Sequence, residues 1–349
     1  MSAVSIAEGS LVLRPGRVRD AIGARPAFDL QGLLAGRAAD AAGQLLPALF
    51  SLCGGAHRLA AQLALAAARG TTAEAAPALR HALDRQTLAE HLRRLWIDWP
   101  RRLGAGPGDA ASLAALAASP ALRADGDAAA IRAWLAAQVY GQPGADWLAA
   151  WQARDDRALD RWLAAAATLP AALLRPQAAR ARRWLRDADP PLPAPTAAGA
   201  ALAAAAAPCE TGSWTRAGLP PPRHALDRLT ARLAEIARLA PARDDAPLLA
   251  AAGVALGAGH GLGWCEMARG LLVHELRLDA SGARIARYRV LAPTEWNFHP
   301  RGVAARALAA LPAAAAETPA VCALLAAALD PCVEYRVDTQ APVEADAHA

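Results

Sequence analysis

The stretch GLLVHELRLDASGARIARYRVL, residues 270–291, says more about the fold class than any other part of the chain. Apolar and polar residues alternate over 271–278 and again over 285–291, and DASG at 279–282 separates the two runs. A period of two is typical of a half-buried strand, and a Gly-containing connection is typical of a tight turn. The stretch therefore predicts a β-hairpin.

Outward from this hairpin, most periodic segments are helical. Residues 223–240 predict an amphipathic helix with one apolar stripe, and shorter helical patterns occupy much of 29–100, 127–167 and 302–328. Alternation over 2–20, with a turn at Pro15-Gly16, predicts a second hairpin. Residues 104–120 resemble a linker or loop, and the four prolines of 189–195 mark an internal boundary. The pattern indicates a predominantly helical α+β protein.

Composition excludes several classes of protein. The chain has 349 residues, of which 55% are hydrophobic and 20% charged, so it is not a disordered chain. All 37 basic residues are arginine, which is typical of a GC-rich genome, so the net charge of +5 does not indicate nucleic-acid binding. No apolar run is long enough to span a membrane, and no secretory signal is recognisable. These features predict a soluble cytoplasmic protein whose five cysteines are thiols or ligands rather than a disulfide framework.

Two cysteines stand out by their context. Cys53 precedes His57 by four residues in FSLCGGAHRLAA, a spacing that puts both side chains on one face of a helix. Cys332 follows a helical segment and a proline in LDPCVEY. A site that uses both would be closed only by folding.

Five segments, taken in order, resemble the large subunit of nickel–iron hydrogenases. In that family two Cys-x-x-Cys pairs hold nickel and an iron that carries two cyanides and one carbon monoxide. Residues 1–100 and 205–340 carry the resemblance, whereas 104–205 match little. The segments are AEGSLVLR (7–14), GR (36–37) with SLCGGAHRLAA (51–61), ETGSWTR (210–216), residues 266–302 and DPCVEY (330–335).

The departures from the family pattern concern the nickel ligands. The resemblance puts Cys53 at the bridging position of the first pair, and its missing partner falls on Phe50. Cys332 takes the first position of the second pair, and Tyr335 replaces its partner. Two thiolates of four suit nickel poorly, so no nickel is expected. The family's last histidine falls on Asp338, and an early magnesium ligand falls on Gln31.

The residues that surround the iron in the family are matched better than the nickel ligands. By resemblance, Glu8 is a proton-transfer carboxylate, and Arg269 lies beside the diatomic ligands. Thr294 bonds a cyanide, and Asp330 is a carboxylate of the site canopy. Glu90 loosely matches a second canopy carboxylate. Because cyanide nitrogens accept hydrogen bonds, a guanidinium and a hydroxyl would orient them without nickel.

This pattern is similar to that of the HupK/HoxV type of hydrogenase maturation protein. The resemblance implies a non-catalytic scaffold that holds Fe(CN)2CO transiently through Cys53 and Cys332, with His57 beside them. Its implied partners are the hydrogenase large-subunit precursor and other maturation proteins that carry the iron group, with no nucleic acid and no membrane. Two alternatives stay open, namely a degenerate hydrogenase or hydrogen sensor and a ligand-free protein that binds hydrogenase subunits.

The expected fold is a truncated large-subunit-like fold with a central helical bundle and small hairpins near the N-terminus and at about 271–291. One domain is expected over 1–340, followed by a loose tail at 341–349. Within this domain, 1–103 carry the first cysteine, 104–205 form a divergent helical insert, and 206–340 carry the hairpin and the DPC motif.

The other cysteines have weaker claims. Cys265 could be a third thiolate, although packing in a strand or helix is favoured, and Cys322 lies in an Ala/Leu segment typical of a core. Cys209 could be either. Glu8 and Arg269 could also form a plain salt bridge, without a ligand.

Overall fold

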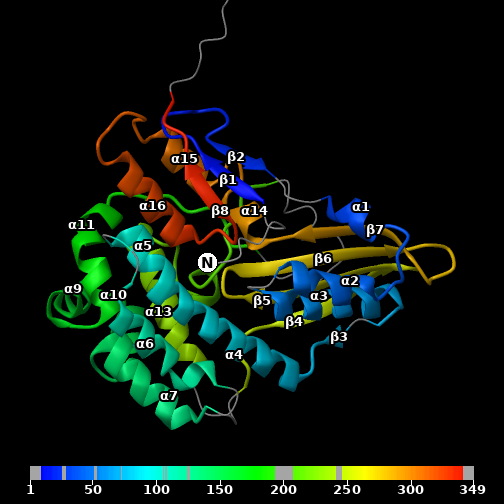
Figure 1. The fold of residues 1–349 in the computed structure, drawn as a ribbon, viewed down its shortest axis with the longest axis horizontal. Helices are drawn as coiled ribbons and strands as arrows, with labels where there is room; N and C mark the ends of the chain where they lie inside the picture. Colours follow the sequence, from blue (N-terminus) through cyan, green and yellow to red (C-terminus); the bar gives the residue numbers. More distant parts are fainter. Residues whose placement is uncertain are drawn as a thin grey trace, which may run out of the picture.

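The computed structural model describes residues 9–25, 29–50, 53–71, 73–104, 106, 108–123, 126–192, 207–240 and 246–340. A β-sheet with covering helices lies on one side and a helical region on the other, and a small sheet joins the two ends of the chain between them (Figure 1).

The predicted hairpin at 271–291 is confirmed and is part of a larger antiparallel sheet. Its strands are β6 (Gly270–Leu278) and β7 (Ile285–Leu291). The sheet order is β3-β4-β5-β6-β7, where the other strands are β3 (Ala73–Glu74), β4 (Ala251–Gly257) and β5 (His260–Met267). Strands β4 and β5 were not predicted, because glycines interrupt the alternation of apolar and polar residues in them.

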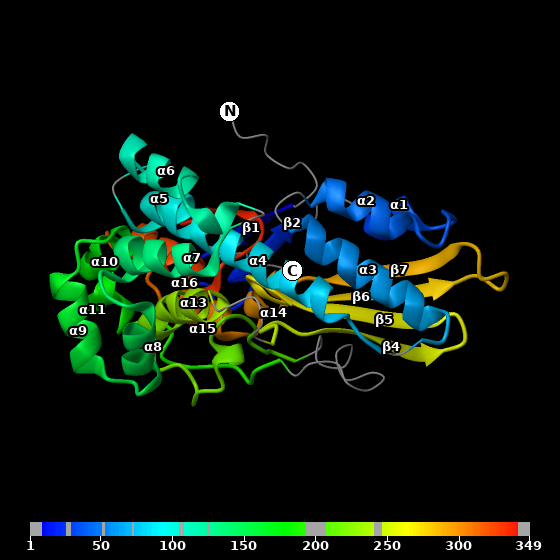
Figure 2. The same ribbon diagram turned by 90° about the horizontal axis from the view of Figure 1, so that it is seen from below.

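Helix α3 (Gly54–Ala68) lies along one face of this sheet, beside α2 (Ala41–Leu49) and near the short α1 (Leu30–Leu34) (Figure 2). Gly261 and Gly263 form the floor beneath α3, where an added Cβ would overlap the helix backbone at Ala64 and Ala60 respectively. This close approach fixes the height of α3 above the sheet and so fixes Cys53 at its N-cap.

A second, three-stranded sheet joins the chain ends. Strand β1 (Ser10–Leu13) pairs antiparallel with β2 (Ile22–Arg25) and parallel with β8 (Glu334–Val337). The N-terminal hairpin expected over 2–20 lies in part outside the described residues, and its second strand, β2, begins beyond residue 20. The parallel partner β8 is more than 300 residues away and could not be read from local alternation.

The helical region contains the predicted helix of 223–240 as α13 (Ala225–Leu239). This helix is buried on nearly all sides, including its charged residues, rather than along one apolar stripe. It packs against α4 (Pro77–Arg93), α8 (Gly144–Gln152) and α16 (Thr318–Leu329). Its burial makes it the centre of the helical core.

Most of the other described helices extend this helical region, whereas α14 contacts β6. The expectation of a linker over 104–120 is wrong in part, because α6 forms within it, capped by the Asp109 side chain. The domain division remains a prediction. No helix in the described ranges combines the length and the apolar character that crossing a membrane requires. These further helices are η1 (Arg94–Asp98, π-helical), α5 (Trp99–Leu103), α6 (Ala110–Ala117), η2 (Pro120–Leu122), α7 (Ala128–Leu135), η3 (Ala136–Tyr140, π-helical), α9 (Asp156–Ala165), α10 (Leu169–Leu174), η4 (Arg175–Gln177), α11 (Ala178–Ala181), η5 (Thr215–Ala217), α14 (Pro293–Asn297) and α15 (Val303–Ala309).

Candidate functional site

Cys53 lies at the start of α3, between the sheet and the helical region. It is the N-cap residue of the helix and is buried. The backbone N–H of His57 donates to the Cys53 carbonyl over 3.1 Å, so the two residues share the first turn. The shared helix face predicted from their spacing is therefore consistent with the structure.

His57 belongs to a buried chain of three side chains. Its Nδ1 lies 3.0 Å from Nε2 of His274, and Nδ1 of His274 lies 2.7 Å from the Tyr288 hydroxyl. Burial lowers the pKa of His57 to about 3 and the pKa of His274 well below its usual value, so both rings are neutral at pH 7. The hydrogen bond from Nδ1 and the stacking of the ring on Phe50 fix the orientation of His57.

Cys332 lies in the turn that follows α16 and is only partly buried. Thr294, at the start of α14, makes two bonds to it. Its hydroxyl donates to Cys332 Sγ over 3.0 Å and accepts the Cys332 backbone N–H over 3.0 Å. The residue predicted to lie beside the cyanides therefore also orients the predicted ligand.

Arg269, in the turn between β5 and β6, connects the two cysteines. Its guanidinium is buried, and Nη1 lies 2.6 Å from Glu90 Oε1. Negative charge on Glu90, Asp330, Cys53 and Cys332 raises the pKa of Arg269, although burial opposes this shift. The cysteines from the two ends of the chain therefore lie within electrostatic reach of one guanidinium.

Asp330 is the buried C-cap of α16, with a left-handed φ of 48°. Its carboxylate faces four guanidiniums, which together hold the pKa of Asp330 well below its usual range although burial alone would raise it. The nearest nitrogens are those of Arg232 at 3.1 Å, Arg94 at 3.5 Å, Arg102 at 3.8 Å and Arg269 at 3.9 Å.

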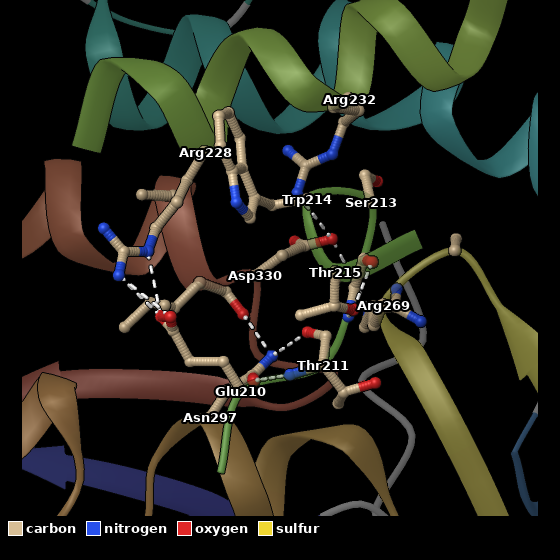
Figure 3. Close-up of a pocket in the computed structure, with 14 residues that line it drawn as sticks. Glu210, Thr211, Ser213, Trp214, Thr215, Arg228, Arg232, Arg269, Asn297 and Asp330 are labelled. Atoms are coloured by element: carbon tan, nitrogen blue, oxygen red, sulfur yellow. Dashed lines mark hydrogen bonds and ion pairs between the residues drawn. The ribbon is translucent and has the colours of Figure 1, made fainter. Parts of the chain in front are cut away.

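A pocket opens beside this carboxylate. Figure 3 shows Asp330 below Arg232, next to the loop that carries Thr211, Ser213 and Thr215. The cavity measures about 40 Å³. Arg228 from α13 holds the Glu210 carboxylate with nitrogen–oxygen distances of 2.6 and 2.8 Å at its rim.

Several charged residues of this region carry no distinctive signal in the sequence. Arg94, Arg102 and Arg232 lie on helices whose patterns indicate only amphipathic faces. Glu235, on α13, is fully enclosed by His91, Arg216 and Ser213. The available signal in α13 was the pair Arg228 and Arg232, four residues apart, but exposed helix faces carry the same spacing.

The remaining cysteines lie in packed surroundings. Cys265 on β5 is fully buried and donates to the Ala56 carbonyl over 3.4 Å, and burial raises its thiol pKa, which supports the packing alternative. Cys322 is buried in α16. Cys209 is buried against Trp264 and its neighbours, and burial raises the pKa of its thiol.

The residues at the lost family positions have structural contacts. Phe50 stacks on the His57 ring at 4.2 Å between centroids, and Arg102 lies over the Tyr335 ring at 5.4 Å. Gln31 bonds the backbone of β7 at Ala286 and Tyr288, and Asp338 pairs with Arg14.

Two predictions, the role of Glu8 and the metal site, have no direct test. Glu8 lies outside the described residues. Strand β1 begins two residues after it, and the first residue of β1 pairs with Glu334, two residues after Cys332. Within the described ranges, no group of three or more His, Cys, Asp and Glu side chains is arranged to hold a metal ion.

Curated proteins similar to this chain are hydrogenase formation proteins. The chain is 40% identical over 366 residues to "Hydrogenase expression/formation protein HoxV" of Cupriavidus necator, covering 95% of each chain. It is 33% identical over 356 residues to "Hydrogenase expression/formation protein HupK" of Rhizobium leguminosarum bv. viciae, covering 90% of this chain and 91% of that protein. The HupK of Azotobacter vinelandii is 34% identical over 343 residues, covering 90% and 92%. No family model matches the chain.

Solved structures with a similar fold are hydrogenase large subunits, as the sequence predicted. A [NiFeSe] hydrogenase from Desulfovibrio vulgaris Hildenborough aligns with a TM-score of 0.54 at 15% identity, covering 90% of this chain and 92% of that one. An NAD+-reducing [NiFe]-hydrogenase aligns with a TM-score of 0.51 at 16% identity, covering 87% and 90%. At these identities the likeness concerns the fold alone.

Proposed function

Because the chain belongs to the family of HoxV and HupK hydrogenase expression/formation proteins, we propose that it is a scaffold in hydrogenase maturation. It holds the Fe(CN)2CO group as cargo through Cys53 and Cys332 and passes it to the hydrogenase large-subunit precursor. It acts in the cytoplasm, without catalysing a reaction, and receives the iron group from other maturation proteins.

One observation carries this proposal: Arg269 interacts electrostatically with both cysteines, although they are 279 positions apart in the numbering. Two thiolates can serve as iron ligands, and a buried guanidinium beside them can donate hydrogen bonds to cyanide nitrogens. Nη1 of Arg269 pairs with Glu90, whereas Nε and Nη2 are buried without a hydrogen bond in the described part of the chain. A cyanide acceptor would satisfy this donor capacity.

Thr294 adds a second argument for cargo at this position. Its hydroxyl is held 3.0 Å from Cys332 Sγ, so the sulfur has a fixed donor and one preferred direction. A sulfur oriented in this way loses little conformational freedom on binding a metal.

The aromatic residues at the lost ligand positions support cargo without nickel. Phe50 stacks in parallel on His57, and the partly buried Tyr335 packs against the main core in β8. A phenyl ring cannot bind nickel, and burial raises the pKa of the Tyr335 hydroxyl, which disfavours a phenolate ligand. Two ligands in place of four would also bind the iron group weakly enough for transfer.

Anaerobic purification followed by infrared spectroscopy tests the proposal. Cyanide and carbonyl stretching bands with iron and without nickel are expected in the wild type. The bands should disappear in Cys53→Ala and Cys332→Ala, and Cys209→Ala, which removes a thiol from another cluster, should keep them. Full retention of the bands and of hydrogenase maturation in either site variant would refute the proposal.

The same preparations separate the alternatives. Nickel in the purified chain together with hydrogen-dependent dye reduction would instead support a degenerate hydrogenase or hydrogen sensor. Binding to hydrogenase subunits that survives removal of both cysteines, with no infrared bands in the wild type, would support a ligand-free interaction protein.

A further inference from the structure

Four arginines gather behind the Cys332 turn, and we refer to Arg94, Arg102, Arg232 and Arg269 as the arginine cluster. They come from η1, α5, α13 and the turn after β5, and each has a nitrogen within 3.9 Å of an Asp330 carboxylate oxygen. Their side chains are at most 12% exposed. Burying this much like charge is costly unless something compensates it.

Fewer carboxylates than arginines surround the cluster in the described part of the chain. Asp330 faces all four guanidiniums, Glu90 pairs with Arg269 at 2.6 Å, and Asp98 pairs with Arg94 at 2.8 Å. Four positive groups therefore meet three negative ones. Nε and Nη2 of Arg269 and Nε of Arg232 also lack hydrogen-bond acceptors in the described part of the chain. Both the charge count and these donors point to an anionic guest.

Part of the cluster also has a structural role. Arg102 and Arg232 donate weakly to the carbonyls of Ala326 and Ala327 near the C-terminus of α16, over 3.5 and 3.4 Å, and Arg94 donates to Pro331 over 3.5 Å. Positive charges near the C-terminus of a helix interact favourably with the helix dipole. Any test must therefore separate the charge of the cluster from its support of the turn.

A metal bound to two thiolates forms a unit whose net charge depends on the other ligands of the metal. A bare divalent ion on two thiolates gives a neutral unit, whereas Fe(CN)2CO on two thiolates carries two negative charges. In both cases two metal–sulfur bonds form and the thiol protons leave to solvent, with no change of oxidation state. Only the second guest gains from the excess positive charge of the cluster.

We propose that the arginine cluster selects the guest by charge, so that the two cysteines accept a metal that arrives with its own anionic ligands and gain nothing toward a bare divalent cation. Arg94, Arg102 and Arg232 thereby become specificity-determining residues. This inference rests on the proposed function and names the property by which that site recognises its cargo.

The test compares two guests on the same purified full-length chain, kept anaerobic. One guest is a synthetic dicyano-carbonyl iron(II) complex, followed by its infrared bands and the iron content. The other is cobalt(II), followed by its thiolate charge-transfer absorption. The variants are Arg232→Gln, which removes one charge, and Arg232→Lys, which keeps it. Arg80→Gln, on α4 and about 21 Å along the helix from Arg94, is the matched control.

Arg232→Gln should weaken uptake of the iron complex about tenfold or more, because one positive charge is lost beside a dianion. Its binding of cobalt(II) should stay within about twofold of wild type, because that unit is neutral. Arg232→Lys should recover most of the iron uptake, and Arg80→Gln should match wild type with both guests.

Parallel loss of both guests in Arg232→Gln, without recovery in Arg232→Lys, would show a purely structural role and overturn the inference. Equal iron uptake by wild type and Arg232→Gln would overturn it too, while leaving the proposed function intact. A wild-type chain that takes up no iron complex would overturn both.

Discussion

At the scale of single residues, Thr294 shows how one hydroxyl prepares a sulfur. It donates to Cys332 Sγ and accepts from the Cys332 N–H, both over 3.0 Å. One side chain therefore fixes both the turn and the direction of its thiol. The hydroxyl position was identified by family resemblance, and its bonds to Cys332 emerged from the structure.

Thr294→Val should destabilise the chain by about 1–3 kcal/mol, because the Cys332 N–H loses its acceptor in a partly buried site. Urea unfolding measures this change. Thr294→Ser, which keeps the hydroxyl, should lie close to wild type, and equal stability of all three proteins would contradict the assigned bonds.

His57 and His274 illustrate a second single-residue effect. Both are buried with lowered pKa values, so the unfolded chain binds protons more readily than the folded one below the usual histidine pKa of 6.5. The free energy of unfolding is therefore not reduced by these histidines above about pH 6.5. It falls as the pH drops from there toward the pKa of the folded state, which is about 3 for His57.

The free energy of unfolding should therefore drop below pH 6.5 by up to about 1.4 kcal/mol per pH unit for each of the two histidines. Urea unfolding of the metal-free chain between pH 7.5 and 5 measures the slope. His274→Gln should reduce this slope, and an unchanged slope would show that these rings do not carry the effect.

At the scale of elements, β5 decides where α3 lies. The glycines of GAGHGLGW (257–264) have the wrong spacing for a nucleotide-binding loop. In the structure Gly261 and Gly263 let the helix backbone lie directly on the strand. Cys53 at the helix N-cap inherits its position from this contact.

Gly263→Ala should cost about 3 kcal/mol or more, because the new methyl group would overlap backbone atoms of α3 that cannot shift independently. Thermal or urea unfolding checks this cost. Gly106→Ala is the control, since open space surrounds that position and its stability should stay near wild type.

At the scale of the whole molecule, the site depends on joining the two chain ends. Strand β1 pairs with β8 in parallel register from Ser10 and Glu334 onward, and Arg269 from the middle of the sequence interacts with both cysteines. The segment of each cysteine holds only one of the two predicted thiolate ligands. The candidate site is therefore a product of the complete fold.

A bifunctional thiol reagent such as dibromobimane should link Cys53 to Cys332 in the native chain, because the proposed function requires both thiols to bind one iron. Peptide mass spectrometry identifies the linked pair. The link should vanish in urea and in Cys53→Ala, and a native chain that yields only single labels would contradict the shared site.

The sequence by itself determined the hairpin of β6 and β7, the helix α13 and the chemical identity of the two cysteines with Thr294, Arg269 and Asp330. Periodicity and residue chemistry are local properties, so they can be read along the chain. Only the tertiary structure decided that β4 and β5 extend the hairpin, that β8 pairs with β1, and that Arg94, Arg102 and Arg232 face Asp330. These outcomes depend on long-range packing. A buried arginine and an exposed one have the same spacing along a helix, so the sequence does not show which of them will meet a carboxylate from a distant segment.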